Sequence, residues 1–294
     1  CNLYFGAAGP ALQRYIDLMH EAIAASGDVL SEKNQVDARM FTPEFVIEAD
    51  RLFDEAERLV ADDAVRLKHV LAARMPVDYV VLMRRAEYVV ATAGQPWKLD
   101  FERRRNRLFD TAKAEQVSQY RQDGKLEELA SLIAIERRTA PIPDFVSGAA
   151  GTDWVEFQDL GFNRYYDAPI VQDAAASDGA AVRMSGKSAA WSVQFKLDKL
   201  PAEGRWDLYM AIRADAGAGD LAKTAVQVGS HPPMNRFVAV PLDGLAKGTY
   251  QYVKVPGGPF VREVNHEKGV HVQAVPAAGA EHVFVDRLIA VRIR

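Results

Sequence analysis

Hydrophobic side chains recur at helical spacing in the first half of the chain and at strand spacing in the second half. Apolar residues three or four positions apart predict helices over about residues 10–25, 43–60, 63–90, 101–112 and 126–135. From Trp154 onward apolar and polar residues alternate, as in Trp191–Leu197 and Trp206–Arg213, which predicts strands with one buried face. The chain is therefore expected to be multidomain all-α plus all-β, with a bundle of about five helices followed by an antiparallel two-sheet β-sandwich.

A short segment between the two halves fits neither period. Residues 140–151 contain Pro141, Pro143, Gly148 and Gly151, which discourage both helix and strand. We therefore predict a helical bundle at 1–139, a linker at 140–151 and a β-sandwich at 152–294.

Several helix starts carry capping signals. Thr42-Pro43-Glu44 combines a capping hydroxyl, a proline suited to the first turn and a carboxylate near the positive end of the helix dipole. Asp62 or Asp63 can cap the third helix, in which Pro76 predicts a kink, and Asp100 can cap the fourth. On the fourth helix Arg103, Arg104, Arg105 and Arg107 form a basic cluster. A solvated helix face with nearby acids explains this cluster better than a contact to a phosphate or acidic sugar.

Composition narrows the classes of protein. The 294 residues are 49% hydrophobic and 26% charged, which is ordinary for globular domains. The net charge of −4 argues against nucleic acid as the main partner, and no run reaches the ~20 apolar residues that a membrane span needs. Cys1 is the single cysteine, so we expect neither an intrachain disulfide nor a cysteine metal cluster.

Sequence motifs for catalysis are missing from the chain. It contains no nucleophile elbow, phosphate-binding glycine loop, dinucleotide fingerprint or zinc-protease helix motif. The nearest approach to a metal motif is His266-Glu267-Lys268-Gly269-Val270-His271, expected to be an extended loop, where a spacing of five suits neither one helix face nor one strand face. Whether this chain is itself an enzyme stays uncertain, and we expect it not to be catalytic.

Aromatic residues of the second half have two candidate roles. Trp191 and Trp206 fall in phase with the apolar residues of their strands, so we expect both in the core. Tyrosines on polar positions can instead offer flat faces to a sugar ring. The predicted carbohydrate-binding residues are Tyr165, Tyr166, Tyr209 and Tyr252.

The first half resembles the helical region that follows the catalytic barrel in glycoside-hydrolase-like proteins related to α-glucuronidases and β-hexosaminidases. The resemblance rests on Asn2–Pro10, on Tyr15–Glu21 and on Phe41-Thr42-Pro43-Glu44. It implies that a (β/α)8 barrel with the catalytic acids lies upstream of Cys1, in the same polypeptide. It also implies that the helices pack on that barrel and that the chain is a C-terminal fragment.

The second half is similar to jelly-roll carbohydrate-binding modules of the galactose-binding-like type. Residues 173–182 match an early stretch of these modules, and Val283–Leu288 match their closing strand. The resemblance implies a structural calcium ion, with Asp286 as the late ligand and Glu156 or Asp178 as the early one. The paired early glutamates of those modules are missing here. The resemblance also implies an extracytoplasmic location, periplasmic or secreted.

Three functions follow as hypotheses. The first is a non-catalytic accessory region of a glycoside-hydrolase-like protein, in which the helices support the upstream barrel and the sandwich binds carbohydrate. The second is a structural or dimerisation module without glycan binding, which predicts an apolar patch on the helices. The third is an enzyme that degrades a polysaccharide, which requires two acids facing each other across a cleft.

Overall fold

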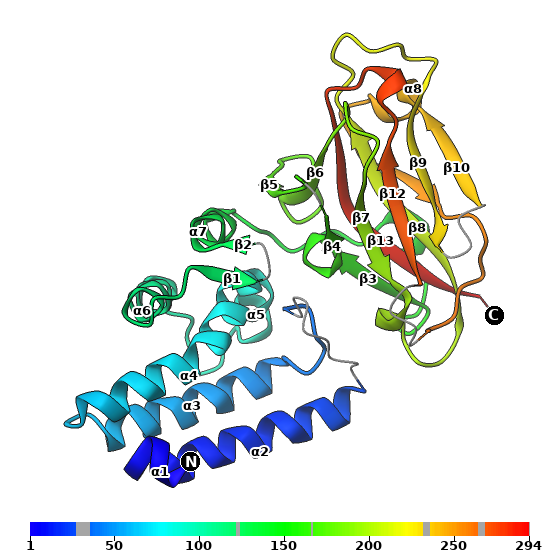
Figure 1. The fold of residues 1–294 in the computed structure, drawn as a ribbon. Coiled ribbons are helices and arrows are strands. Elements are labelled where there is room, and N and C mark those ends of the chain that lie inside the picture. Colours follow the sequence, from blue (N-terminus) through cyan, green and yellow to red (C-terminus); the bar gives the residue numbers. More distant parts are fainter. Residues whose placement is uncertain (28–35, 122–123, 166, 232–235, 264–267, 294) are drawn as a thin grey trace. The chain divides into compact units, whose positions relative to one another are not determined.

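The computed structural model describes residues 1–27, 36–121, 124–165, 167–231, 236–263 and 268–293 (Figure 1). It contains two compact units, Cys1–Ala134 and Ile135–Arg294. The first is helical and the second consists mainly of antiparallel strands, which confirms the predicted fold class. Residues 135–151, which include the predicted linker, belong to the second unit.

The helical unit follows the predicted order of helices with two additions. Its elements are α1 (Asn2–Phe5), η1 (Gly6–Ala8), α2 (Gly9–Ser26), α3 (Pro43–Leu59), α4 (Ala64–Met83), α5 (Arg85–Ala91), α6 (Phe101–Ala114), β1 (Gln119–Arg121), β2 (Gly124–Lys125) and α7 (Leu126–Ala134). The short helix α1 and the β1–β2 hairpin were not predicted, because segments this short carry too few residues for a period to show.

Side-chain caps begin three of these helices where the sequence predicts them. Thr42 accepts a hydrogen bond from the Phe45 amide, Asp63 from the Arg66 amide and Asp100 from the Arg103 amide. The predicted third helix is divided, however, into α4 and α5. The division lies at Arg84, whose guanidinium binds Glu87 and the carbonyl of Ala38, whereas Pro76 lies inside α4.

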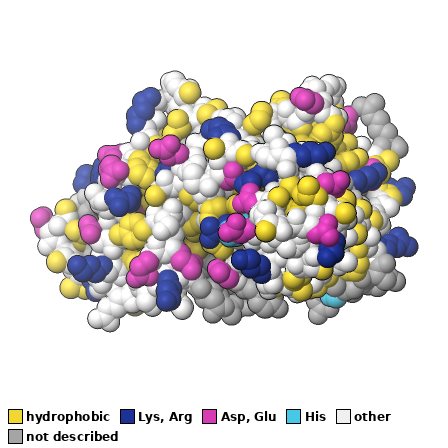
Figure 2. Space-filling model, turned by 90° about the horizontal axis from the view of Figure 1, so that it is seen from above, with side chains coloured by type: hydrophobic (Ala, Val, Ile, Leu, Met, Phe, Trp, Pro, Cys, Tyr) yellow, Lys and Arg dark blue, Asp and Glu magenta, His cyan; other side chains and the backbone are white. Residues whose placement is uncertain are grey.

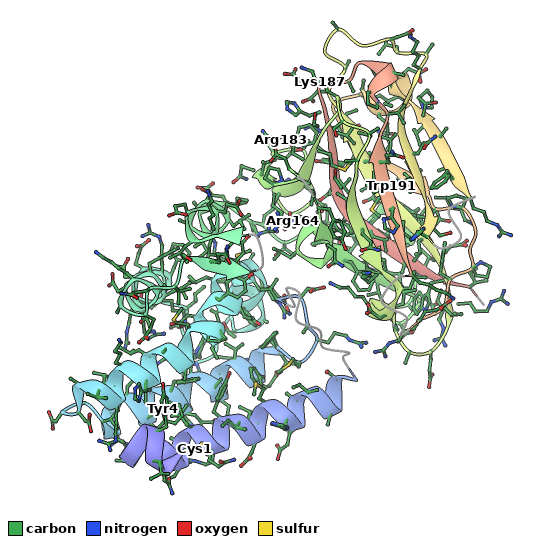
Figure 3. All side chains as sticks on the ribbon, viewed as in Figure 1. Cys1, Tyr4, Arg164, Arg183, Lys187 and Trp191 are labelled. Carbon is green, nitrogen blue, oxygen red and sulfur yellow. The ribbon has the colours of Figure 1, made fainter. Side chains whose placement is uncertain are left out.

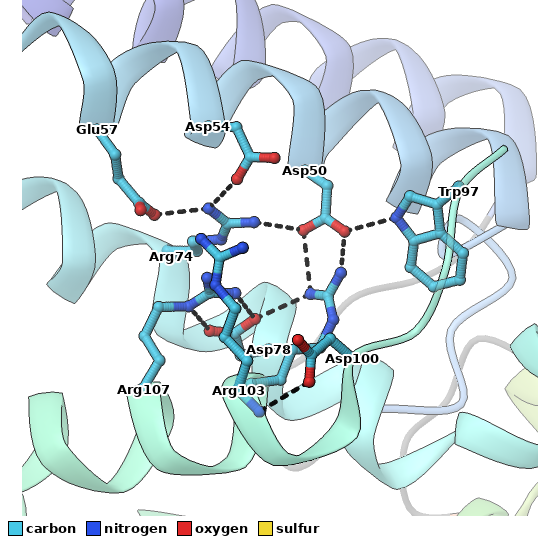
Figure 4. A network of polar contacts seen from close by, with 10 residues as sticks. Asp50, Asp54, Glu57, Arg74, Asp78, Trp97, Asp100, Arg103 and Arg107 are labelled. Atoms are coloured by element: carbon cyan, nitrogen blue, oxygen red, sulfur yellow. Dashed lines mark hydrogen bonds and ion pairs between the residues drawn. The ribbon is translucent and has the colours of Figure 1, made fainter.

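The basic cluster of α6 is only partly a solvated helix face. Arg103 is exposed, but Arg104 is buried and donates to Asp50 and Asp78 (Figure 4). Arg107 also donates to Asp78, with distances of 2.7 Å. The prediction of a solvated face is therefore wrong for these two arginines, because their acidic partners come from α3 and α4 and not from α6 itself.

The second unit is a sandwich of two antiparallel sheets. One sheet has the order β10-β9-β12-β7-β4, and the other has the order β11-β8-β13-β6-β5 with β3 also paired to β13. Their strands are β3 (Trp154–Gln158), β4 (Asn163–Arg164), β5 (Ile170–Gln172), β6 (Ala180–Ser185), β7 (Trp191–Lys196), β8 (Arg205–Ala214), β9 (Thr224–His231), β10 (Phe237–Pro241), β11 (Gln251–Lys254), β12 (Gly269–Ala274) and β13 (His282–Ile293). Short helical pieces connect them: η2 (Asp144–Val146), η3 (Asp159–Gly161), η4 (Leu197–Lys199), α8 (Leu242–Leu245) and η5 (Pro276–Ala278).

The core of the sandwich lies between the two sheets. Trp206, Leu208, Met210 and Ile212 of β8 are at most 2% exposed, and Val193 and Phe195 of β7 in the other sheet are fully buried. Alternation along each strand sends the intervening side chains to the outer faces. The core position predicted for Trp206 is confirmed.

Residues 141–145 contact part of the outer face of the β11-β8-β13-β6-β5 sheet. The Phe145 ring of η2 lies on Tyr209 and Tyr252, and Arg287 of β13 donates to the carbonyl of Pro141. Ala176 packs with Ala181 and Phe284 in a second small cluster. The outer face of the opposite sheet therefore carries the candidate site.

Candidate functional site

One row of side chains crosses all five strands of the β10-β9-β12-β7-β4 sheet. In register, Phe237 lies opposite Gly229, Gly229 opposite His271, His271 opposite Gln194 and Gln194 opposite Asn163. On β12 the fully buried Val270 and Val272 alternate with His271, so the row lies on the outer face. The sheet thus brings a phenyl ring, an imidazole and two amides together, although they come from distant parts of the chain.

Trp191 joins this row through an irregularity in β7. The pairing of β7 with β12 runs regularly from Lys196 to Val193 and then shifts, so that Trp191 and not Ser192 lies opposite Gln273. Such a bulge re-aims the side chain that follows it. Trp191 is half-buried and contacts two residues of the outer row, so the prediction that it belongs to the core is wrong (Figure 3 labels Trp191 on the sandwich).

The aromatic rings of the outer face contact one another. The Trp191 and Phe237 ring centroids are 5.2 Å apart with an interplanar angle of 30°, and Trp191 meets His271 edge to face at 5.8 Å. Gly229 makes this packing possible, because a Cβ atom there would lie 2.2 Å from the Phe237 ring. The result is an apolar ring surface bordered by polar groups, the combination on which sugar C–H faces and hydroxyls are commonly bound.

Polar contacts on the same face connect Tyr165 to His271. The Tyr165 hydroxyl donates to Gln194 Oε1 at 2.8 Å, and Asn163 Nδ2 donates to the same oxygen at 3.5 Å. Gln194 Nε2 lies 3.1 Å from His271 Nε2. We call Tyr165, Gln194 and His271 the polar relay.

His271 is neutral at pH 7. Burial lowers its pKa to about 4, and the electrostatic influence of His231 and Lys196 acts in the same direction. Among the described residues, its buried Nδ1 atom has no hydrogen-bond partner, and neither has Nδ1 of the neighbouring His231, whose ring lies 5.5 Å away. Since buried polar groups are nearly always paired, these two atoms mark a place where a polar partner would be favourable.

The predicted tyrosines do not form one site. Tyr165 lies in the polar relay on one face of the sandwich, whereas Tyr209 and Tyr252 lie on the other sheet beneath the Phe145 ring. Lys254 lies 5.9 Å from the Tyr209 ring centroid, and the Tyr252 hydroxyl accepts from Arg287 at 2.8 Å. Tyr166 lies outside the described residues.

The predicted calcium ligands are engaged with arginines and hydrogen-bond donors. Arg137 binds Asp159 at 2.7 and 2.8 Å and also binds Asp178, while Arg287 binds Glu156. Asp286 accepts from the amide and hydroxyl of Ser177 at 3.0 and 2.9 Å. Burial raises the pKa of Asp286 to about 7 and, together with the charge of Asp159, also raises that of Asp178.

These residues do not fit a calcium ion. A hard cation needs six to eight oxygen ligands, whereas two nearly buried guanidinium groups already supply positive charge to the carboxylates. Within the described residues, no group of three or more His, Cys, Asp or Glu side chains is placed to hold a metal. His271 of the histidine pair lies on β12, and His266 and Glu267 fall outside the described residues.

A cavity of 560 Å³ opens in the helical unit beside α2 and α3. Its lining is mainly apolar, with charged groups at Glu21, Arg39, Glu44 and Glu48, and it includes Leu18, Ala22, Met40 and Phe45. Residues 28–35, which connect the two helices, lie outside the described chain. We therefore place the candidate site on the outer face of the β10-β9-β12-β7-β4 sheet and not in this cavity, because the structure describes every residue of the site on the sheet.

Two further properties agree with the composition. Acidic and basic side chains are interspersed on the face of the molecule in Figure 2, as the small net charge suggests. Among the described helices, none combines the length and apolar character that crossing a membrane requires.

The signals for the site residues were partly present in the sequence. Gly269–Ala274 alternates Val270, Val272 and Ala274 with His271 and Gln273, which is a strand pattern. The glycine at position 269 instead favours the predicted extended loop at His266–His271, and the structure has a strand from Gly269 onward. The contacts of Gln194 and Phe237 with His271 and Trp191 have no signal in the sequence.

Comparison with protein-family models gives no match. Comparison with curated proteins gives none either.

Solved structures with a likeness to this chain include two carbohydrate-binding modules. The family 35 carbohydrate-binding module from Clostridium thermocellum is 13% identical, with a TM-score of 0.35, and the match covers 47% of this chain and 98% of that one. The CBM22-1 xylan-binding domain from Paenibacillus barcinonensis is 11% identical, with a TM-score of 0.33, over 48% and 95%.

The likeness extends beyond carbohydrate-binding modules. An insecticidal crystal protein of Bacillus thuringiensis, Cry7Ca1, is 8% identical, with a TM-score of 0.31, over 48% of this chain and 23% of that one. Similarity at these values assigns no ligand to this chain.

Proposed function

We propose that the sandwich binds carbohydrate on the outer face of the β10-β9-β12-β7-β4 sheet. The observation that carries the proposal is the row from Phe237 to Asn163, with Trp191 beside it, which combines ring surfaces with amide and imidazole groups. Rings stack on the C–H face of a sugar, while the amides and the imidazole hydrogen-bond its hydroxyls. The site moves from the predicted Tyr209 and Tyr252 to this face, and Tyr165 is retained.

Within this proposal the chain is a non-catalytic accessory region of a glycoside-hydrolase-like protein. The helical unit would support a catalytic barrel upstream in the same polypeptide, and the protein would act outside the cytoplasm, where polysaccharides occur. The supporting observation in the helical unit is a group of exposed apolar side chains, Leu3 (98% exposed), Tyr4 (56%) and Val65 (65%). Tyr4 stacks on His69, one helical turn from Val65, so Tyr4 and Val65 lie on one surface.

The experiment is titration calorimetry of the chain with a panel of soluble oligosaccharides: xylohexaose, cellohexaose, mannohexaose and trigalacturonic acid. We expect binding of at least one, and at least a tenfold loss of affinity in Trp191→Ala. Tyr209→Ala and Tyr252→Ala, on the opposite sheet, are the matched controls and should bind as the wild type does. Equal heats of dilution for every sugar, or losses only in the two tyrosine variants, would refute the assignment of the site.

A dimerisation module is the second candidate, because the exposed surface of Leu3, Tyr4 and Val65 also suits a second copy of the chain. Light scattering during gel filtration tests the dimerisation candidate, because it measures whether the chain is a monomer or a dimer. A dimer that becomes a monomer in Leu3→Glu/Val65→Glu would favour this candidate, whereas a wild-type monomer would exclude it.

A further inference from the structure

The orientation of the Gln194 amide determines the proton position on His271. Gln194 Oε1 accepts from two donors, the Tyr165 hydroxyl at 2.8 Å and Asn163 Nδ2 at 3.5 Å. This leaves the amide nitrogen facing His271, with Nε2 to Nε2 at 3.1 Å. An amide nitrogen donates and does not accept, so His271 Nε2 must accept from it.

A neutral imidazole carries one proton, which then lies on Nδ1. His271 is neutral at pH 7 because burial lowers its pKa to about 4. The Nδ1–H group is consequently a donor of fixed position, and it is the ring nitrogen that lacks a partner in the part of the chain that the structure describes. His271 is 91% buried, so the orphaned donor is unfavourable unless an acceptor reaches it.

Rings from neighbouring strands surround His271 on the sheet face. Gly229, opposite His271 on β9, has no side chain, and the Phe237 ring packs over it. The Trp191 and His231 rings stand nearly perpendicular to the imidazole, at 85° and 89°. Both are only half-buried, and we infer that a bound sugar displaces one of them to reach Nδ1.

We propose that Tyr165 and Gln194 are positioning residues that hold His271 Nδ1–H as a fixed donor to an acceptor oxygen of the bound sugar. This inference rests on the proposed carbohydrate binding. The oxygen can belong to a ring or hydroxyl of a neutral sugar or to the carboxylate of a uronic acid, since both offer lone pairs. In this proposal the site recognises a sugar that places an acceptor oxygen near His271 Nδ1–H while the sugar lies beside the Trp191 ring.

Gln194→Glu reverses the relay with almost no change of shape. A carboxylate accepts only, so it accepts hydrogen bonds from His271 Nε2–H and from the Tyr165 hydroxyl, and neutral His271 then presents an unprotonated Nδ1. Measurements at pH 8.5 keep the imidazole neutral beside the new negative charge. Tyr165→Phe removes the main donor to Oε1, which lets the amide rotate and gives a mixture of tautomers. Tyr209→Phe on the other sheet is the control.

The test combines nitrogen NMR of the histidine rings with calorimetry, using xylohexaose as the neutral probe and trigalacturonate as the acidic one. The His271 signals are assigned by their absence in His271→Gln. We expect the Nδ1–H tautomer in the free wild type and the Nε2–H tautomer in Gln194→Glu. A bound probe should shift the wild-type Nδ1 signal, and Gln194→Glu should lose at least tenfold in affinity while keeping the wild-type circular dichroism spectrum.

An Nε2–H tautomer in the free wild type overturns the relay, whatever the sugar binding. Unchanged affinity in Gln194→Glu, or a bound probe that leaves the Nδ1 signal in place, overturns its role in recognition while carbohydrate binding stands. Failure of both probes to bind the wild type overturns the role of Nδ1 for these sugar classes. If the whole oligosaccharide panel also fails, the proposed function falls, and the tautomer measurement still decides the relay.

Discussion

Trp191 and Trp206 occupy similar positions in two alternating strands, yet they have different surroundings. Trp206 is 2% exposed in the core, whereas the bulge in β7 places Trp191 on the outer face beside Phe237 and His271. Substituting each tryptophan by alanine should therefore affect different properties: sugar binding for Trp191 and the stability of the fold for Trp206.

Trp191→Ala is expected to weaken sugar binding at least tenfold, about 1.4 kcal/mol, and to change the free energy of unfolding little. Trp206→Ala should instead cost about 3–5 kcal/mol of stability, because it leaves a cavity in the core. Calorimetry and urea denaturation of both variants measure this. A Trp191→Ala protein as unstable as Trp206→Ala would return Trp191 to the core.

Sugar binding should also depend on pH through His271. Its pKa is lowered to about 4 in the folded protein, so the neutral ring contributes stability above its ordinary pKa, and this contribution is lost as the pH falls toward 4. A protonated ring carries hydrogen on Nε2 and can no longer accept from Gln194.

Affinity should accordingly be constant from pH 8 to 6 and fall as the pH approaches 4. His271→Gln should bind more weakly and lose this dependence, as titration calorimetry at several pH values with circular dichroism as a folding control would show. A wild-type affinity that is unchanged at pH 4 would contradict the role given to His271.

At the scale of elements, two arginines stabilise the sandwich where a calcium ion was expected. Arg137 pairs with Asp159 and Asp178, and Arg138 donates to the carbonyls of Ala174, Ala176 and Ser177. Together they attach residues 136–138 to the segment between β5 and β6. The guanidinium group of Arg137 supplies positive charge to the carboxylates of Asp159 and Asp178.

Arg137→Met should cost about 3–5 kcal/mol, because it leaves two buried carboxylates without their partner. Adding Asp159→Asn and Asp178→Asn to this variant should recover part of the loss. Excess chelator should leave the melting temperature of the wild type unchanged. Thermal denaturation with and without chelator shows whether a bound calcium ion stabilises the sandwich. A lower melting temperature with chelator would support the calcium prediction.

The elements that the sequence predicted best are those with long, regular periods. Thr42, Asp63 and Asp100 begin helices as expected, and β8 largely follows its alternation. Short strands such as β4, β5 and β6 were missed, because two to six residues carry little periodic signal. The end of α4 at Met83 was missed because apolar residues continue at helical spacing into α5.

At the scale of the molecule, each compact unit has its own buried polar centre. In the helical unit, Asp50 accepts from Arg74, Arg104 and the Trp97 indole (Figure 4). The candidate sugar-binding residues all belong to the other unit.

Asp50→Ala should therefore destabilise the helical unit by about 3–5 kcal/mol, because Arg74 and Arg104 lose a buried partner. Sugar affinity should stay at the wild-type value. Far-ultraviolet circular dichroism during urea denaturation follows the helices, and calorimetry follows binding. A parallel loss of affinity would show that the site depends on the helical unit.

The sequence by itself determined the division into a helical half and a β half, the helix caps and the buried face of the longer strands. These depend on residues near one another in the chain, where period and capping act directly. Only the tertiary structure decided which side chains form the candidate site, because Asn163, Gln194, Gly229, Phe237 and His271 meet through the register of five strands. It also decided the place of Trp191, since a shift of one residue in pairing reverses the face on which a side chain lies.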